Sequence, residues 1–408
     1  MAVFSGYNQS LDARSDASEE LCCARRAHES VLIGSKLYVF GGYCLRDYPE
    51  HEFEFRRQQI FSYDIVTKKW IQHTTKAEND SKMPRPCTGA KCAALGHTIY
   101  SFGGLQVNIT DQMRLFSNKT YALDTTTMTW RCCKVDGTAV PSGRDKYALC
   151  VDDTRLLIFG GWSLRIDKNR LQDGAVWVPE EDKIVGWNNE LYAFETETEK
   201  WVSIHTSGTR PSPRAAHTMN KVGDDRVILF GGRQPDRRMN DIHVLNLRTM
   251  TWSGVILPSG GVNELWPSPR SLHSMCLVAK SLVLIGGMNR DGDCCKDFAW
   301  VLDVDQMKWE KLFSKDKSLC RTWHTTSAAS FVGGYTELYT FGGTPDNIWK
   351  PGSRDLRGPA VITMGVKSLY RLCLEAVELH RGMVHLSIHT LPLSIQEEFW
   401  ARYGRSGV

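Results

Sequence analysis

An apolar run that ends in Phe-Gly-Gly or Ile-Gly-Gly occurs six times in this chain, and this repeat restricts its fold more than any other sequence feature. The glycine pairs lie 55 to 71 residues apart, at Gly41-Gly42, Gly103-Gly104, Gly160-Gly161, Gly231-Gly232, Gly286-Gly287 and Gly342-Gly343. A short strand-like segment ending in Trp follows each of the first five pairs, at Trp70, Trp130, Trp201, Trp252 and Trp309. Arg-x-x-His or a close variant precedes most pairs. A repeat of this length is one supersecondary unit, which buries its faces only by stacking on its neighbours.

Each unit reads as four short antiparallel strands, and such units stack radially around a channel. The pattern resembles the kelch repeat, and its six copies cover roughly residues 20–365. We therefore predict an all-β, six-bladed kelch β-propeller at 21–365, after an N-terminal segment at 1–20. The glycine pairs, the tryptophans and the repeated histidines are predicted to be structural, since they recur at scaffold positions.

Composition narrows the classes of function. The formal net charge of +4 is small for 408 residues and comes without a long basic run, which argues against nucleic-acid binding. No apolar stretch of 18 residues and no signal-like N-terminus is present, so we expect no membrane segment and a cytoplasmic or nuclear location. The 13 cysteines lack zinc spacing and are expected to be reduced thiols. No nucleotide-binding or hydrolase motif is found, so we expect no catalytic residue, metal or cofactor.

Antiparallel pairing should bring the Arg-x-x-His entrance of each blade and the residue after its Gly-Gly pair to one face of the disc. The second x gives Ala27, Cys87, Lys146, Ala216, Leu272 and Trp323, with blade 2 matched loosely through Arg85. The residue after the pair gives Tyr43, Leu105, Trp162, Arg233, Met288 and Thr344. Positions on this face that differ between blades are candidates for a ligand surface.

Cations and aromatic rings are interleaved on that face. Lys146, Arg233 and Arg238 are accompanied by Trp162 and by Trp187 of the blade 3 insertion. Guanidinium groups bind carboxylates in bidentate fashion, and an aromatic wall strengthens the pairing by lowering the local dielectric. An anionic ligand is one interpretation. The other is that Arg233 and Arg238 form ordinary loop salt bridges with Asp236 or Asp241.

Several motifs on this face resemble the kelch-domain-containing protein 1 and 2 subfamily over nearly the whole chain. They are P-x-x-R-D-K around Lys146, GWN at Trp187, FGGR-x-x-x-x-R-M-N-D from Arg233 to Asp241, and R-x-W-H at Trp323. The resemblance implies a substrate receptor of a cullin-2 RING ubiquitin ligase that reads the C-terminus of its substrate, favours a terminal diglycine and directs the substrate to proteasomal degradation. It also implies that the carboxylate is held by Arg233, Arg238 and Ser271, between walls formed by Lys146, Trp187 and Trp323.

Two positions depart from the subfamily pattern. Leu272 stands where the family has Trp, and Trp162 stands where it has Tyr. We expect the carboxylate clamp to persist while the preference for the last two or three substrate residues shifts.

The kelch pattern stops near residue 365, and the segment 366–408 has a helical apolar period that begins at Ser368. It is either a terminal helix packed under the propeller or a docking element. Its Leu369, Cys373 and Val377 resemble an elongin-binding BC-box, and Leu391, Pro392 and Ile395 resemble a cullin-2 box. That resemblance implies elongin B, elongin C, cullin-2 and a RING-box protein as partners.

Two further hypotheses concern partners. The tail Ser406-Gly407-Val408 carries a free carboxylate, and self-association through docking of this tail into the mouth is one hypothesis. The alternative to the whole ligase interpretation is a non-ligase kelch scaffold, an actin- or protein-binding module that makes no use of elongins.

Overall fold

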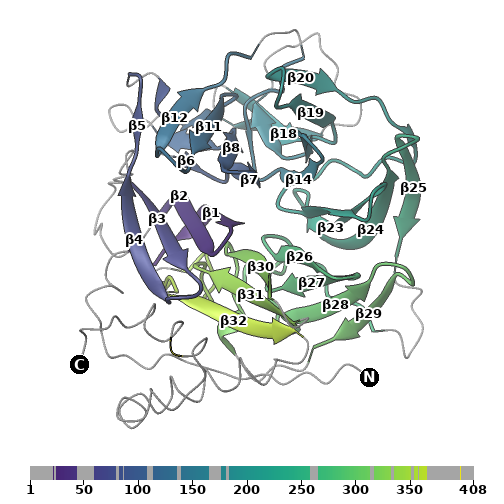
Figure 1. Cartoon of the computed structure of the whole chain (residues 1–408). Coiled ribbons are helices and arrows are strands. Elements are labelled where there is room, and N and C mark those ends of the chain that lie inside the picture. The colour runs from purple at the N-terminus through teal and green to yellow at the C-terminus, as the bar shows by residue number, and fades with distance from the viewer. Residues whose placement is uncertain are drawn as a thin grey trace.

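The computed structural model describes residues 22, 24–43, 59–79, 82–85, 87–107, 114–135, 139–164, 176–180, 183–257, 265–312, 317–331, 335–350, 353–356, 358–364 and 396. Within them, the strands form six radial sheets, the blades, around a common centre (Figure 1). No helix in this described part is long and apolar enough to cross a membrane.

The first three blades each start at the centre and run outward. Blade 1 consists of β1 (Arg26–Ile33), β2 (Lys36–Tyr43), β3 (Gln59–Asp64) and β4 (Lys69–Thr74). Blade 2 consists of β7 (Lys91–Leu95), β8 (Thr98–Phe102), β11 (Thr120–Asp124) and β12 (Thr129–Cys132), with β5 (Lys76–Ala77) added parallel to β12. Blade 3 consists of β14 (Ala148–Asp152), β15 (Arg155–Phe159), β19 (Leu191–Glu195) and β20 (Lys200–Ser203).

The other three blades follow the same order. Blade 4 consists of β22 (Thr218–Val222), β23 (Arg226–Arg233), β24 (Arg238–Asn246) and β25 (Thr251–Ile256), with β21 (Ser207–Gly208) parallel to β25. Blade 5 consists of β26 (Ser274–Val278), β27 (Ser281–Ile285), β28 (Ala299–Asp303) and β29 (Lys308–Lys311). A 3-10 helix, η2 (Lys317–Leu319), leads to blade 6, described as β30 (Thr325–Phe331), β31 (Tyr335–Phe341) and β32 (Pro359–Met364).

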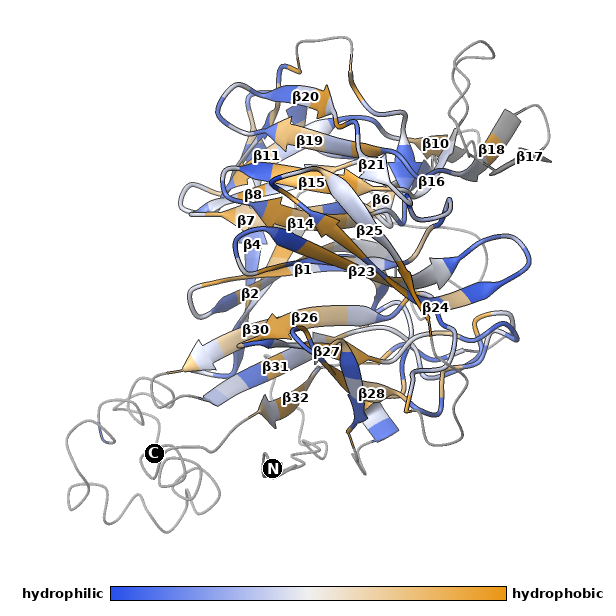
Figure 2. Ribbon diagram, turned by 90° about the vertical axis from the view of Figure 1, so that its right-hand side faces the viewer, coloured by the Kyte–Doolittle hydropathy of each residue, from blue (hydrophilic) through white to orange (hydrophobic). Residues whose placement is uncertain are grey.

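Two small sheets extend blades 2 and 3 toward one side of the disc. One pairs β6 (Cys87–Thr88), β9 (Leu105–Val107) and β10 (Arg114–Phe116); the other pairs β13 (Arg144–Asp145), β16 (Trp162–Leu164), β18 (Lys183–Trp187) and β17 (Val176–Glu180). Seen edge-on, β16 lies toward the right of the molecule (Figure 2). This is the face that carries the Arg-x-x-His entrances, and we call it the mouth face.

The ring closes through the innermost strands. β1 contacts β7 on one side and β30 on the other, and the contacts continue from β7 to β14, β22, β26 and back to β30. The predicted six-bladed, all-β propeller is therefore confirmed. The segment limits 1–20, 21–365 and 366–408 stay predictions, and the C-terminal helix lies outside the described residues.

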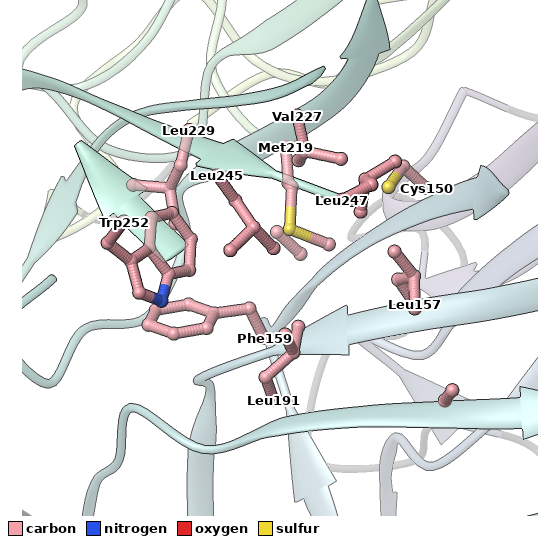
Figure 3. Packing of buried hydrophobic residues seen from close by; sticks show 12 residues of the cluster. Cys150, Leu157, Phe159, Leu191, Met219, Val227, Leu229, Leu245, Leu247 and Trp252 are labelled. Atoms are coloured by element: carbon pink, nitrogen blue, oxygen red, sulfur yellow. The ribbon is translucent and has the colours of Figure 1, made fainter. Parts of the chain in front are cut away.

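The repeated tryptophans pack between blades, which is a structural role of the kind predicted for them. Each one meets the Phe that precedes the Gly-Gly pair of the preceding blade, with ring centroids 4.7–6.0 Å apart in the pairs Trp70–Phe341, Trp130–Phe40, Trp201–Phe102, Trp252–Phe159 and Trp309–Phe230. Figure 3 shows one such core, in which Trp252 and Leu245 of blade 4 pack with Phe159 and Leu191 of blade 3. A buried aromatic pair of this kind contributes about 0.5–1.5 kcal/mol to stability beyond the burial of its surface area. The contact between Trp and Phe therefore stabilises the packing of neighbouring blades.

The glycine pairs are required by close approach. Gly160 has a φ of +66°, and a Cβ there would lie 2.7 Å from the carbonyl oxygen of Arg214 in the next blade. Gly161 has a φ of +103°, and its Cβ would lie 2.8 Å from the Cβ of Tyr147 in its own blade. Only glycine has both the backbone freedom and the missing side chain that these positions demand.

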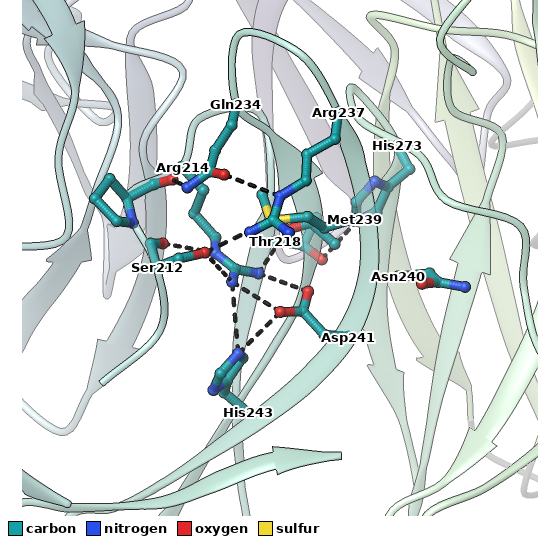
Figure 4. Close-up of polar contacts among 12 residues, drawn as sticks. Ser212, Arg214, Thr218, Gln234, Arg237, Met239, Asn240, Asp241, His243 and His273 are labelled. Atoms are coloured by element: carbon teal, nitrogen blue, oxygen red, sulfur yellow. Dashed lines mark hydrogen bonds and ion pairs between the residues drawn. The ribbon is translucent and has the colours of Figure 1, made fainter. Parts of the chain in front are cut away.

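The arginines of Arg-x-x-His hydrogen-bond to the glycine pairs. In five blades the guanidinium donates a hydrogen bond of 2.9–3.1 Å to the carbonyl oxygen of the first glycine, from Arg25, Arg144, Arg214, Arg270 and Arg321. Arg214 also donates to both oxygens of Asp241 at 2.8 Å, while the Asp241 carboxylate contacts His243 (Figure 4). Burial of Asp241 opposes its ionisation, but the hydrogen bonds from His243 and Arg214 prevail and hold the pKa of the carboxyl well below its usual range.

The register of blade 2 differs from our expectation. Backbone N–H to O=C hydrogen bonds of 2.6–3.2 Å form a closed circle around the channel. They link the residue at the second x of Arg-x-x-His in each blade to the equivalent residue of the next blade: Ala27, Gly89, Lys146, Ala216, Leu272 and Trp323. The prediction of Cys87 for this circle is wrong. Cys87 instead stands at the position that the repeat arginine holds in the other blades. The prediction aligned Arg85 with that arginine, but blade 2 has no arginine there. All six members have φ between 52° and 65°, which is the left-handed region.

Candidate functional site

The mouth face is built by pairing the two sequence positions singled out above. The residue after each Gly-Gly pair lies opposite the first x of Arg-x-x-His, in the pairs Arg26–Tyr43, Thr88–Leu105, Asp145–Trp162, Ala215–Arg233, Ser271–Met288 and Thr322–Thr344. Since the second x sits in the adjoining hydrogen-bonded circle, both sets border the channel entrance. The predicted grouping of these positions on one face is confirmed.

Cations and tryptophans of three blades form one contiguous surface. Trp162 and Trp187 are cross-strand neighbours on β16 and β18, with ring centroids 4.9 Å apart. The guanidinium carbon of Arg233 lies 5.8 Å from the Trp162 ring and 5.6 Å from the Trp187 ring. Lys146 Nζ lies 5.7 Å from Trp162 and 5.9 Å from Trp323, so it connects blade 3 to blade 6. We call Lys146, Trp162, Trp187, Arg233, Arg238, Ser271, Leu272 and Trp323 the mouth cluster.

Arg233 and Arg238 face each other across the hairpin of β23 and β24. Burial lowers the pKa of Arg233, an effect that Asp145 partly offsets, while burial and the charge of Arg233 lower the pKa of Arg238 to about 10. Two adjacent guanidinium groups that repel each other raise the local affinity for an anion.

The salt-bridge alternative for these arginines does not hold for Asp241. Its carboxylate is committed to Arg214 at 2.8 Å and to His243 at 3.0 Å. Among the described residues, no ion pair joins Asp236, or any other carboxylate, to Arg233 or Arg238.

Several buried polar atoms without a hydrogen-bond partner lie together at the mouth. In the described part of the chain they include the indole N–H of Trp162, Trp187 and Trp323, the Nε–H of Arg233 and Arg238, and the hydroxyls of Ser271 and Thr322. Ser271 and Thr322 are both 0% exposed. A buried donor left unpaired costs about 1–3 kcal/mol, and these seven donors on one face are chemically suited to a ligand that brings acceptors.

Two residues of this surface are missing from the sequence prediction. Thr322 is the first x of Arg-x-x-His in blade 6, the position that Ser271 holds in blade 5, and this equivalence was the available signal. Asp145 holds that position in blade 3, forms an ion pair with Lys146 and leaves its Oδ1 unpartnered. Burial raises the pKa of Asp145, although the Lys146 charge opposes the rise. Asp145 thus neutralises Lys146 and leaves the excess positive charge on the two arginines.

A cavity of about 230 Å³ lies in the channel. Lys146, Leu272 and Trp323 line it together with the repeated histidines, and an ion pair of 2.7 Å between Lys91 and Glu29 lies further along its wall. Leu272, at a φ of 57°, is therefore a wall residue of the entrance.

The remaining predicted positions are not located. Leu369, Cys373, Val377, Leu391, Pro392 and Ile395, as well as the tail Ser406-Gly407-Val408, lie outside the described residues. Their docking roles, and the ligand-binding role of the mouth cluster, stay predictions.

Comparison with known proteins places this architecture among relatives. The model of the KLHDC2/KLHL20/DRC7 Kelch-repeats domain matches residues 7–183 and 180–343. The chain is 31% identical over 406 residues to Kelch domain-containing protein 1 of Homo sapiens, which covers 94% of this chain and 94% of that protein. It is 31% identical over 402 residues to Kelch domain-containing protein 2 of Bos taurus, with 95% of this chain and 93% of that protein covered.

Proposed function

Because this chain belongs to the kelch-repeat family that includes Kelch domain-containing proteins 1 and 2, we propose that it is the substrate-recognition subunit of a cullin-2 RING ubiquitin ligase. It binds the carboxyl-terminal end of target proteins in the mouth cluster and acts in the cytoplasm or nucleus. It contributes affinity and proximity, whereas the recruited RING subunit and conjugating enzyme carry out ubiquitin transfer.

The unpaired donors of the mouth carry this proposal. A carboxylate is acceptor-only and takes up to about four hydrogen bonds, which matches the guanidinium and hydroxyl donors of Arg233, Arg238 and Ser271. The chain terminus is the carboxylate that every protein substrate has, and it can enter an opening between walls. The indoles of Trp162 and Trp187 supply donors for the backbone carbonyl groups that precede it.

The walls support a preference for small terminal residues. Trp162 and Trp187 stack on Arg233 from one side, and Trp323 borders Lys146 on the other. Bulky walls beside a clamped carboxylate disfavour a Cβ on the last residue, which favours glycine. Leu272 is smaller than an indole, so this side of the entrance accepts more than a strict diglycine.

A peptide comparison tests the chain-end proposal. A labelled peptide ending in Gly-Gly is titrated with the full-length protein as the free acid and as the C-terminal amide. We expect the acid to bind and the amide to lose at least about 30-fold in affinity, because a charge-paired buried contact is worth about 2–5 kcal/mol. Equal affinity of the two peptides would overturn the chain-end proposal.

The ligase assignment rests on the BC-box-like and cullin-2-box-like residues, and it has its own test. The wild-type chain should co-purify with elongin B, elongin C and cullin-2, and a Leu369→Ala, Cys373→Ala double variant should lose all three. A control variant, Arg237→Ala, changes an exposed propeller residue and should retain them. Failure of the wild-type chain to co-purify with them would favour the non-ligase kelch scaffold, and retention by the double variant would show that Leu369 and Cys373 are not the contact.

A further inference from the structure

Three cysteines lie beside the mouth cluster and have no part in the proposed recognition. Cys294 and Cys295 belong to the blade 5 loop that follows Gly286-Gly287, and Cys320 directly precedes the Arg-x-x-His segment of blade 6. All three are free thiols. Cys294 and Cys295 are buried, at 8% and 3% exposure, whereas Cys320 is partly exposed.

The sulfurs of Cys294 and Cys320 converge across the boundary between two blades. Both thiols point at one acceptor, the carbonyl oxygen of Cys295, at 4.0 Å from Cys294 Sγ and 3.7 Å from Cys320 Sγ. Each thiol is also the largest influence on the ionisation of the other. Cys295 contributes its backbone carbonyl oxygen to this convergence. The cluster is therefore a pair of converging thiols with a third cysteine beside it.

This arrangement is not a metal site. In the portion of the chain that the structure covers, no group of three or more His, Cys, Asp or Glu side chains is arranged to hold an ion. Two thiols that converge on one carbonyl oxygen, one of them partly exposed, have the arrangement of a redox pair instead.

We propose that Cys294 and Cys320 form a reversible disulfide that links blades 5 and 6 at the mouth and weakens chain-end binding. Hydrogen peroxide is the oxidant. The Cys320 thiolate attacks one peroxide oxygen and becomes a sulfenic acid, while the displaced hydroxide takes up the thiol proton and leaves as water. The Cys294 sulfur then attacks the sulfenic sulfur, and its proton leaves with the hydroxyl group as a second water. Two thiols lose two electrons, and the peroxide is reduced to two waters.

The electrostatics favour Cys320 as the attacking thiol. The neighbouring Cys294 thiol lowers the pKa of Cys320, and the charge of Arg270 acts in the same direction, while partial burial and Asp297 oppose them. The neighbouring Cys320 and burial raise the pKa of Cys294. The exposed member thus has the greater thiolate character, and the buried member resolves the intermediate.

Each of the two cysteines is connected to a residue of the mouth cluster. Cys294 forms an isolated β-bridge with Met288. Met288 in turn exchanges backbone hydrogen bonds of 2.8 and 3.1 Å with Ser271, which is a residue of the mouth cluster. On the other side, Cys320 is three residues before Trp323. Bonding requires the sulfurs to close to about 2.05 Å, which displaces one or both segments. Because recognition sites tolerate shifts of only about 0.5 Å, we expect the oxidised protein to bind about fivefold more weakly.

The first experiment tests the bond itself. Full-length protein is treated with hydrogen peroxide, its remaining thiols are alkylated, and a non-reducing peptide map is read by mass spectrometry. We expect a cross-linked pair containing Cys294 and Cys320, reversed by a thiol reductant and absent from Cys320→Ser and Cys294→Ser. The matched control Cys295→Ser should still form it. No cross-link, or one that needs Cys295, overturns the proposal.

The second experiment tests the effect on binding, which rests on the proposed function. The free-acid Gly-Gly peptide is titrated against reduced and oxidised wild type and against Cys320→Ser after the same peroxide treatment. Weaker binding by oxidised wild type alone supports the proposal, and equal affinity in the presence of a proven disulfide overturns the regulatory part. If the reduced protein fails to bind the peptide, the chain-end function fails, while the mass spectrum still decides the disulfide.

Discussion

Two sets of arginines in this propeller have the same chemistry and opposite environments. Arg144, Arg214 and Arg270 belong to the repeat, are 0% exposed, and each bonds a glycine carbonyl and an acidic side chain of its own blade. Arg233 and Arg238 occur in one blade only, are partly exposed, and have no carboxylate partner among the described residues. The recurring arginines have their hydrogen bonds satisfied and belong to the scaffold, whereas the two unique arginines keep bonding capacity unused, as the proposed site requires.

The largest expected effect is the loss of a repeat arginine. Arg214→Ala leaves Asp241 buried next to His243 without its guanidinium partner, which should cost about 3–5 kcal/mol in the free energy of unfolding. Urea denaturation followed by tryptophan fluorescence measures this loss. The exposed neighbour Arg210 serves as a control, and Arg210→Ala should stay within about 0.5 kcal/mol of wild type. Equal stabilities of the two variants would remove the distinction drawn between the arginine sets.

The second prediction concerns Arg238, an arginine of the mouth cluster. Its loss should reduce peptide affinity and leave the stability of the protein nearly unchanged. Arg238→Ala should leave the unfolding free energy within about 1 kcal/mol of wild type, because it removes a half-buried charge that repels Arg233. It should lower the affinity for a free-acid Gly-Gly peptide at least about 30-fold. Calorimetric titration and denaturation of the same sample check both parts. Arg237→Ala is the control, since Arg237 is exposed and its side chain donates to Gln234 Oε1 at 3.0 Å, outside the mouth cluster (Figure 4). A large stability loss without a binding loss would place Arg238 with the scaffold.

The same comparison explains how much was predictable from the sequence. The blades follow from residues whose spacing and chemistry recur, and Arg233, Trp162 and Lys146 were found because they break that recurrence on one face. Blade 2 was misaligned because Arg85 resembles a repeat arginine in sequence, whereas backbone hydrogen bonds place Gly89 in the circle. Local patterns cannot distinguish those two possibilities.

The unmet hydrogen-bonding capacity of the mouth was beyond sequence reasoning. Nothing in the sequence distinguishes Thr322 from other threonines. Its hydroxyl is identified as unpaired only when buried donors and acceptors are compared in three dimensions. The pairing of Cys294 with Cys320 likewise joins two blades and depends on how those blades meet. Such properties arise from the packing of distant segments and not from any one repeat.

The pH dependence of binding gives a third, intermediate effect. Arg238 has a pKa of about 10, lowered by burial and by Arg233, so it loses its charge as the pH rises through that value. The affinity for a free-acid peptide should be nearly constant between pH 6 and 9 and fall about fourfold by pH 10.5, since about three quarters of Arg238 is then neutral. Fluorescence anisotropy measures the profile, with circular dichroism at each pH to verify folding. Arg238→Ala should lack the alkaline decrease, and an identical decrease in that variant would assign it to another group.

The smallest effect should come from the entrance wall, where Leu272 replaces the Trp expected from the family. Leu272 has a φ of 57° and Trp323 has a φ of 59° at the equivalent position of the next blade, so this backbone already accepts an indole. Leu272→Trp should increase the affinity for a Gly-Gly end about two- to fivefold through added aromatic contact. It should weaken an end such as Gly-Val by a similar factor, because the wider entrance is lost. Parallel titrations of both peptides against wild type and variant measure this shift. Leu265→Trp, at an exposed site that does not line the channel cavity, is the matched control and should change neither affinity. If Leu272→Trp altered both affinities equally, the wall would contribute to binding strength without selecting the terminal residue.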